Sequence, residues 1–233
     1  MIQELLTERP PVVTNGTAAP RCKLSAHYRA LVQRLQAANM AAPENQMIET
    51  LGVTSCARGA GVSTVAFNVA VAAARADIGP VLLVDADINK QANRSLIADS
   101  PALGLADALA DAVDPMDCIV NMPIENLSIV AGRGKAKHDE LTFDPFKAAE
   151  LFNEYKCHFK LLIVDMPAPT ELNGSIYLAG QLDGVLLVIE SEFSDGRVAV
   201  RLKQQLVDAN TNILGVVLNK RRKHVPNWLY NRL

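Results

Sequence analysis

The sequence predicts one α/β domain: a doubly wound, mostly parallel sheet with helices on both faces. Two observations support this fold class. Short apolar runs typical of buried strands alternate along the chain with segments of helical pattern. The small and branched aliphatic residues that dominate the composition suit a parallel sheet enclosed between helices. Because ligands bind such sheets at the carboxyl ends of the strands, the polar residues that follow each strand are the candidates for function.

Composition narrows the class of protein. The 233 residues are 49% hydrophobic and 21% charged, which suits one substantial globular domain. A net charge of −2 argues against a nucleic-acid binder. The absence of a signal peptide and the wide spacing of the cysteines predict reduced thiols in a cytoplasmic protein. No apolar run approaches the roughly 18 residues that span a bilayer, so we expect membrane contact only through a partner or a surface. The cysteines are Cys22, Cys56, Cys118 and Cys157.

The predicted elements divide the chain into three parts. Residues 1–23 have loop composition and form a mobile leader, residues 24–220 form the domain, and residues 221–233 form a basic tail. The domain begins with an amphipathic helix over residues 24–42. The strands are predicted at Met47–Ser55, Val81–Val84, Leu127–Val130, Lys160–Val164, Gly184–Ile189 and Ile213–Leu218. The helices that follow the first one are predicted up to Ala76 and at Leu105–Ala112, Pro145–Tyr155 and Gly196–Asp208.

A turn with two glycines joins the first predicted strand to its helix. A phosphate-binding P-loop has the pattern GxxxxGK[ST] at this position, where its backbone N–H groups and lysine bind phosphate and its hydroxyl residue binds Mg²⁺. In this chain Gly61 and Ser63 occupy the last glycine and the hydroxyl position. Cys56 replaces the first glycine and Val62 replaces the lysine. Taken alone, a glycine turn before a helix is more often an ordinary turn than a nucleotide site.

Acidic residues follow two of the predicted strands. Asp85 and Asp87 come after the run that begins at Val81, and Asp165 ends the run that begins at Lys160. An acidic residue at a strand end often only caps a loop. Two such ends behind a glycine turn predict the carboxylate cluster that holds Mg²⁺ and water against a nucleoside triphosphate.

These segments resemble, in order and spacing, the cytoplasmic domain of the bacterial tyrosine kinases of capsule and exopolysaccharide export. That family is a branch of the MinD/ParA-like ATPases. Residues 54–70 align without a gap with the family's TSPGPGEGKSTVAANLA motif, and VLLVDAD and LLIVDMPAP resemble its two acidic segments. Residues 104–107 resemble its GLSD turn, and LGVVLNK resembles its last core strand. The resemblance extends roughly from Ala26 to Lys220.

The resemblance implies a set of site residues. ATP or ADP with Mg²⁺ is the implied cofactor, with Asp85 and Asp87 catalytic if the site is active and Ser63, Asp85 and Asp165 at the metal. The implied partner is a membrane-embedded, Wzz-like polysaccharide co-polymerase at the inner membrane, together with self-association into a homo-oligomer. The implied nucleotide-binding residues are Arg58, Gly59, Ala60, Gly61, Val62, Ser63, Thr64 and Asn219.

The chain departs from the family pattern in three places. Val62 removes the lysine of the loop. The family's ExxRxxR ring motif corresponds to Ala26, Arg29 and Val32, so one of its three residues is kept. Tyr230 stands alone where the family carries a cluster of autophosphorylated tyrosines.

Three hypotheses follow from these departures. The first is a pseudokinase that regulates polysaccharide synthesis and export. The second is an active tyrosine kinase or ATPase in which Arg58 or a partner residue supplies the missing cation. The third is a positioning or partitioning protein, against which Ala57 stands where those families carry a signature lysine. The basic tail, with Trp228 and Leu229, suits an anionic lipid surface or an acidic partner, and a solvated chain end fits it as well as these two together.

Overall fold

One mixed sheet forms the centre of the computed structural model, which describes residues 2–4, 26–88, 103–133, 143–169, 174–191 and 196–220. Over these residues the strand order is β1-β8-β7-β2-β6-β3-β5-β4. Every neighbouring pair is parallel except β4 and β5. The strands are β1 (Ile2–Glu4), β2 (Thr50–Ser55), β3 (Val81–Asp85), β4 (Ile119–Asn121), β5 (Leu127–Val130), β6 (Leu161–Asp165), β7 (Gly184–Glu190) and β8 (Ile213–Asn219).

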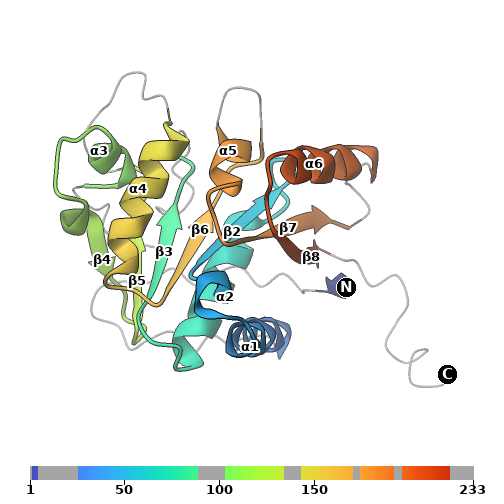
Figure 1. Cartoon of the computed structure of the whole chain (residues 1–233), viewed down its shortest axis with the longest axis horizontal. Helices are drawn as coiled ribbons and strands as arrows, with labels where there is room; N and C mark the ends of the chain where they lie inside the picture. The colour runs from blue at the N-terminus through green and yellow to red at the C-terminus, as the bar shows by residue number, and fades with distance from the viewer. Residues whose placement is uncertain are drawn as a thin grey trace.

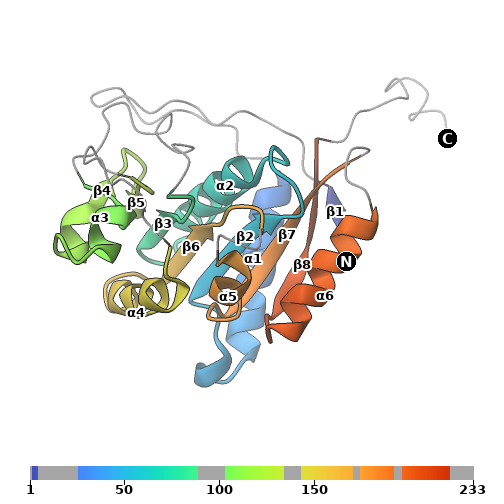
Figure 2. The ribbon, with the colours of Figure 1, turned by 90° about the horizontal axis from the view of Figure 1, so that it is seen from above.

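Helices cover both faces of this sheet (Figure 1). The two helices α1 and α2 pack on one face, and α3, α4, α5 and α6 pack on the other, as the view from above also shows (Figure 2). The predicted three-layer α/β fold is therefore confirmed. The helices are α1 (Ala26–Ala41), α2 (Val62–Arg75), α3 (Leu105–Leu109), α4 (Pro145–Lys156), α5 (Ser175–Ala179) and α6 (Gly196–Asp208).

Two apolar clusters fill the space between the three layers. On the α1–α2 side, Tyr28, Phe67 and the small side chains of α2 pack on the sheet. On the other side, Phe152 and Tyr155 of α4 pack on the same strands. Alternate side chains of each central strand enter the two clusters, so that Leu83 lies in the first and Leu82 in the second. This explains why the sequences of the central strands are mostly apolar.

Most predicted boundaries agree with the structure, and the differences lie in short elements. The strand predicted from Met47 begins at Thr50, after a short 3-10 helix, and the helix predicted at Leu105–Ala112 ends at Leu109. The leader predicted over residues 1–23 contains β1, and its other residues lie outside the described ranges, as does the tail 221–233. Within the described residues, no helix is long and apolar enough to cross a bilayer.

The Asp183 carboxylate joins the starts of β2 and β7. Its Oδ2 accepts hydrogen bonds from the backbone N–H groups of Glu49 (2.9 Å) and Thr50 (2.8 Å) and from the Thr50 hydroxyl (2.9 Å). The Thr50 hydroxyl in turn accepts from the Asp183 N–H at 2.9 Å. These bonds fix how β2, which leads into the candidate site, starts beside β7.

Replacing Asp183 by alanine is expected to lower the free energy of unfolding by about 2–3 kcal/mol, because three donors, two of them on the buried Thr50, lose a charged acceptor. Chemical denaturation measures this change. Asp208→Ala is the control, since this exposed carboxylate accepts one bond from Gln204 within α6, and its effect should stay within about 0.5 kcal/mol. Equal losses for the two variants would contradict the assigned role of Asp183.

Candidate nucleotide site

The loop between β2 and α2 has the curled backbone that a phosphate cradle requires. Gly59 has φ +86° and Gly61 has φ +93°, a left-handed conformation that glycine adopts without steric cost. Gly61 is the N-cap of α2, so the first turn of a 14-residue helix opens beside the loop. The unpaired N–H groups of such a turn, together with the helix dipole, favour a bound anion.

A cavity of about 270 Å³ lies between this loop and the carboxyl ends of the strands. It brings together most of the site residues predicted from the sequence, which come from distant segments of the chain. Three of the predicted site residues, Ala60, Asp85 and Asn219, are buried and lie outside the lining. The lining residues are Ser55, Ala57, Arg58, Gly59, Gly61, Val62, Ser63, Thr64, Asp87, Asp165, Met166, Pro167 and Ala168.

The three predicted carboxylates lie on neighbouring strand ends. Asp85 and Asp165 are register partners on the parallel strands β3 and β6 and are 2% and 3% exposed. The Asp85 Oδ1 accepts a hydrogen bond from the backbone N–H of Asp87 at 3.0 Å, which orients the segment that carries Asp87 to the cavity. The structure therefore brings the predicted cluster together, with Asp87 and Asp165 facing the loop.

The described residues contain no group of three or more His, Cys, Asp or Glu placed to hold a metal ion. Magnesium needs no such cage, because it keeps several waters and binds one or two carboxylates together with the phosphates of a nucleotide. Ser63 and Asp165 line the same cavity, and Asp85 adjoins Asp165. Magnesium coordination by these three residues stays a prediction.

Asn219 reaches the loop from the end of β8. The side chain is fully buried, and its Nδ2 donates to the carbonyl of Ala60 at 2.8 Å. Its Oδ1 is buried without a hydrogen-bond partner. The side chain lies behind the loop and does not line the cavity, so its predicted contact with a nucleotide base stays a prediction. A Cβ on Gly61 would collide with the Asn219 amide, so glycine is the residue that fits there.

Lys220 also contacts the loop, which sequence reasoning missed. Its Nζ donates to the carbonyl of Gly59 at 2.5 Å and lies 3.1 Å from Glu190 Oε1. The only signal was its place directly after the last strand, which puts it at the ligand-binding edge of the sheet. From the sequence alone it is the last residue of the predicted domain, with no role assigned in the site.

Val62 begins α2 and lines the cavity with an uncharged side chain. It is half-buried and packs against the apolar cluster on the α1–α2 side. Arg58, the cation within the loop, is exposed. An apolar group that is anchored in the core thus stands at the position where the family pattern places a lysine.

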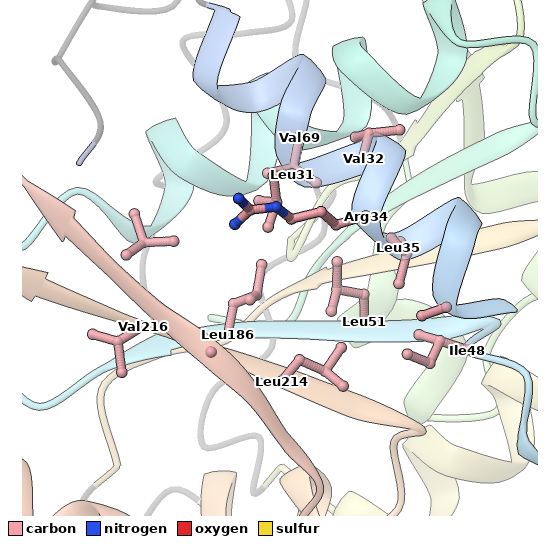
Figure 3. Close-up of a pocket in the computed structure, with 13 residues that line it drawn as sticks. Leu31, Val32, Arg34, Leu35, Ile48, Leu51, Val69, Leu186, Leu214 and Val216 are labelled. Carbon is pink, nitrogen blue, oxygen red and sulfur yellow. The ribbon is translucent and has the colours of Figure 1, made fainter. Parts of the chain in front are cut away.

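A second cavity has different chemistry. It measures about 190 Å³ and lies between α1 and strands β2, β7 and β8, among aliphatic side chains with Arg34 at its side (Figure 3). Its lining suits apolar groups and not phosphate.

On helix α1, Ala26 and Arg29 are exposed while Val32 is buried in the core, so one of the three ring-motif positions is unavailable for contact between subunits.

The cysteines form no site among the described residues. Cys56, Cys118 and Cys157 are all free thiols. Burial, reinforced by the nearby Asp107, raises the pKa of the Cys118 thiol to about 11, so it stays protonated and unreactive near neutral pH. Cys22 lies outside the described residues.

Comparison with curated proteins finds similarity to enzymes and transport proteins of bacterial polysaccharide production. No family model matches the chain. It is 25% identical over 201 residues to the putative tyrosine-protein kinase CapB of Staphylococcus aureus, covering 86% of each. It is 24% identical over 199 residues to the tyrosine-protein kinase CpsD of Streptococcus pneumoniae, covering 85% of each. Against the succinoglycan biosynthesis transport protein ExoP of Rhizobium meliloti, 29% identity covers 73% of this chain and 22% of ExoP.

Solved structures agree with this result at the level of the fold. The chimerical protein CapA2B2 superposes with a TM-score of 0.75 at 23% identity, over 95% of this chain and 94% of that one. The septum site-determining protein MinD of Pyrococcus horikoshii, complexed with Mg-ADP, gives a TM-score of 0.62 at 26% identity, over 78% and 76%. The chain therefore has a single-domain, P-loop NTPase-like α/β fold with a mostly parallel sheet.

Proposed function

We propose that this chain, a relative of the bacterial tyrosine kinases CapB, CpsD and YwqD within the MinD/ParA-like P-loop ATPases, is a pseudokinase subunit of capsule or exopolysaccharide production. It binds a nucleotide and acts through its surfaces, without efficient phosphoryl transfer. The observation that carries this proposal is Val62 as the first residue of α2, lining the cavity.

The loss of a cation at this position affects transfer more than binding. A charge-assisted hydrogen bond to phosphate contributes about 1.5–3 kcal/mol to an equilibrium, and Val62 forfeits this contribution. During transfer, further negative charge develops on the phosphoryl oxygens, and the loop lysine would stabilise that charge as well. Lys220 does not line the cavity and is bonded to Gly59 and Glu190. Arg58 lines the cavity, but it belongs to the exposed loop and not to the first turn of α2, so under this proposal neither cation replaces the lysine.

The residues that remain support nucleotide binding. The glycine loop and the first turn of α2 would hold the phosphates, and the free carbonyl oxygen of Asn219 would accept from the adenine amino group. Ser63, Asp85 and Asp165 would hold Mg²⁺, which neutralises phosphate charge when bound. Asp87, which lines the cavity, would orient water or a hydroxyl group, and Asp85 positions Asp87 through the backbone bond.

A membrane-embedded polysaccharide co-polymerase is the proposed partner, which would hold the chain at the cytoplasmic side of the membrane. The similarity to ExoP supports this, because it covers most of this chain but 22% of a much longer transport protein. In ExoP, the segment similar to this chain is therefore part of a longer transport protein. Self-association stays a secondary proposal, with Arg29 exposed and Val32 buried.

A complementation experiment tests the regulatory role. Deleting the gene in its own host should change the amount or chain length of an extracellular polysaccharide, and the unmodified gene should restore it. Tyr230→Phe should restore it equally, because a pseudokinase does not depend on phosphorylation of that tyrosine. Failure of Tyr230→Phe, or a polysaccharide unaffected by deletion, would contradict the proposal.

An active kinase or ATPase is the second candidate, favoured by the position of Arg58 in the lining of the cavity. The variant Arg58→Ala separates the two. The second candidate predicts phosphoryl transfer by the unmodified protein that falls strongly in Arg58→Ala. The pseudokinase predicts no transfer by either protein when both are incubated with γ-labelled ATP and Mg²⁺.

A further inference from the structure

We infer that Lys220 is a positioning residue that holds the phosphate loop in its curled form from outside the cavity. In this way it stabilises the loop, but it does not supply the positive charge that the missing loop lysine would bring to the phosphates. The inference rests on the nucleotide site proposed above and deepens it, since it explains how binding can survive without turnover.

The backbone at Lys220 directs its side chain back across the loop. Lys220 follows β8 directly and has φ +59°, in the left-handed region that a residue with a Cβ adopts at a cost. Such a conformation persists when surrounding contacts hold it. The contacts are the bond to Gly59 O at 2.5 Å and the ion pair with Glu190 at 3.1 Å.

The last residue of β8 and the residue after it donate hydrogen bonds to two successive carbonyl groups of the loop. Asn219 Nδ2 donates to Ala60 O, and Lys220 Nζ donates to Gly59 O. In a trans peptide the carbonyl and the N–H of the same unit point in opposite directions. Turning the Gly59 and Ala60 carbonyls toward β8 therefore turns the N–H groups of Ala60 and Gly61 away from it. Lys220 and Asn219 thus keep loop N–H groups available for phosphate.

An ion pair with Glu190 holds the Lys220 ammonium group beside the loop. Glu190 ends β7 and is the register partner of Asn219, so the acid and the base lie side by side at the edge of the sheet. Their side chains are 22% and 38% exposed, which leaves the pair only partly screened by solvent. With its charge paired here, Lys220 stabilises the loop without offering a free cation to a transferring phosphoryl group.

The test compares Lys220→Met, which removes the charge and keeps the stem, with Lys220→Arg, which keeps a donor. Lys156→Met is the matched control, because it makes the same change to a lysine that pairs with Glu49 at 3.7 Å, at the opposite end of the sheet. Three quantities are measured: amide hydrogen exchange of residues 57–61 without ligand, calorimetric affinities for Mg-ADP and for adenosine, and the melting temperature.

Lys220→Met should accelerate exchange of the loop amides and weaken Mg-ADP binding by about tenfold or more, the effect of one charged hydrogen bond. Adenosine lacks phosphates, so its affinity should change by less than about threefold. Lys220→Arg should recover most of both losses, and Lys156→Met should change neither.

Two results would overturn the inference. One is loop exchange in Lys220→Met equal to that of the unmodified protein. The other is an equal loss of ADP and adenosine affinity together with a lower melting temperature, which would indicate a general structural role. Absence of nucleotide binding by the unmodified protein would instead contradict the proposed function, and the loop exchange would still decide the role of Lys220.

Discussion

Replacing Val62 by lysine is expected to tighten binding of Mg-ATP by about 10- to 150-fold, the equivalent of one charged hydrogen bond to phosphate of about 1.5–3 kcal/mol. The new ammonium would extend from the first residue of α2 into the cavity that Val62 already lines. Calorimetric titration of the two proteins with Mg-ATP measures the difference. The gain should be larger for ATP than for ADP, because a loop lysine reaches the outer phosphates.

Val62→Met is the control for this substitution. It also replaces a half-buried, branched side chain that packs on the core with a longer, unbranched one, but adds no charge. Its affinity for ATP should remain near that of the unmodified protein. Equal affinities for the lysine and methionine variants would show that the charge is not what the site lacks.

Gly61→Ala is expected to abolish measurable nucleotide binding and to lower the free energy of unfolding by more than about 2 kcal/mol. Two costs add at this position. Alanine is strained at φ +93°, and its Cβ would collide with the Asn219 amide. Displacing Asn219 would break its bond to Ala60 and disturb the loop. Denaturant unfolding and calorimetry measure both effects.

Gly59→Ala separates the two costs. Gly59 has φ +86°, close to that of Gly61, but a Cβ there has no heavy atom within 4 Å among the described residues. The free energy of unfolding of this variant should therefore fall only by the cost of the backbone strain, about 1–2 kcal/mol. If the two variants were equally destabilised, the collision with Asn219 would be excluded as a cause.

The sheet was predictable because its strands are buried on both faces. Leu127–Val130 and Gly196–Asp208 were predicted with the bounds that the structure shows, since a mostly apolar run and a helical period are strong local signals. The glycine loop and the aspartates were also found, because strand ends in a parallel sheet meet at one edge.

Two of the short elements were not predicted. The antiparallel strand β4 (Ile119–Asn121) and the helix α5 (Ser175–Ala179) have three and five residues, too few to show a period. Such elements form because tertiary contacts hold them. Ser128 on β5, for example, donates a hydrogen bond to Asn121 on β4 at 2.9 Å.

The role of Lys220 shows a second limit of sequence reasoning. Its contact with Gly59 joins residues 161 positions apart, and no local pattern encodes such a bond. Lys220 also starts a run of basic residues, so its charge alone gave no reason to place it at the site. Its left-handed φ and the contact of its side chain with the loop are visible only in the structure.

The central claim is that this site binds nucleotide and does not turn it over. The most direct test is to titrate the purified, unmodified protein with Mg-ATP in a calorimeter and to measure phosphate release and phosphate incorporation in the same sample. The account predicts saturable binding with neither release nor incorporation above background. Transfer or hydrolysis at rates typical of kinases, about 1–100 s⁻¹, would contradict it.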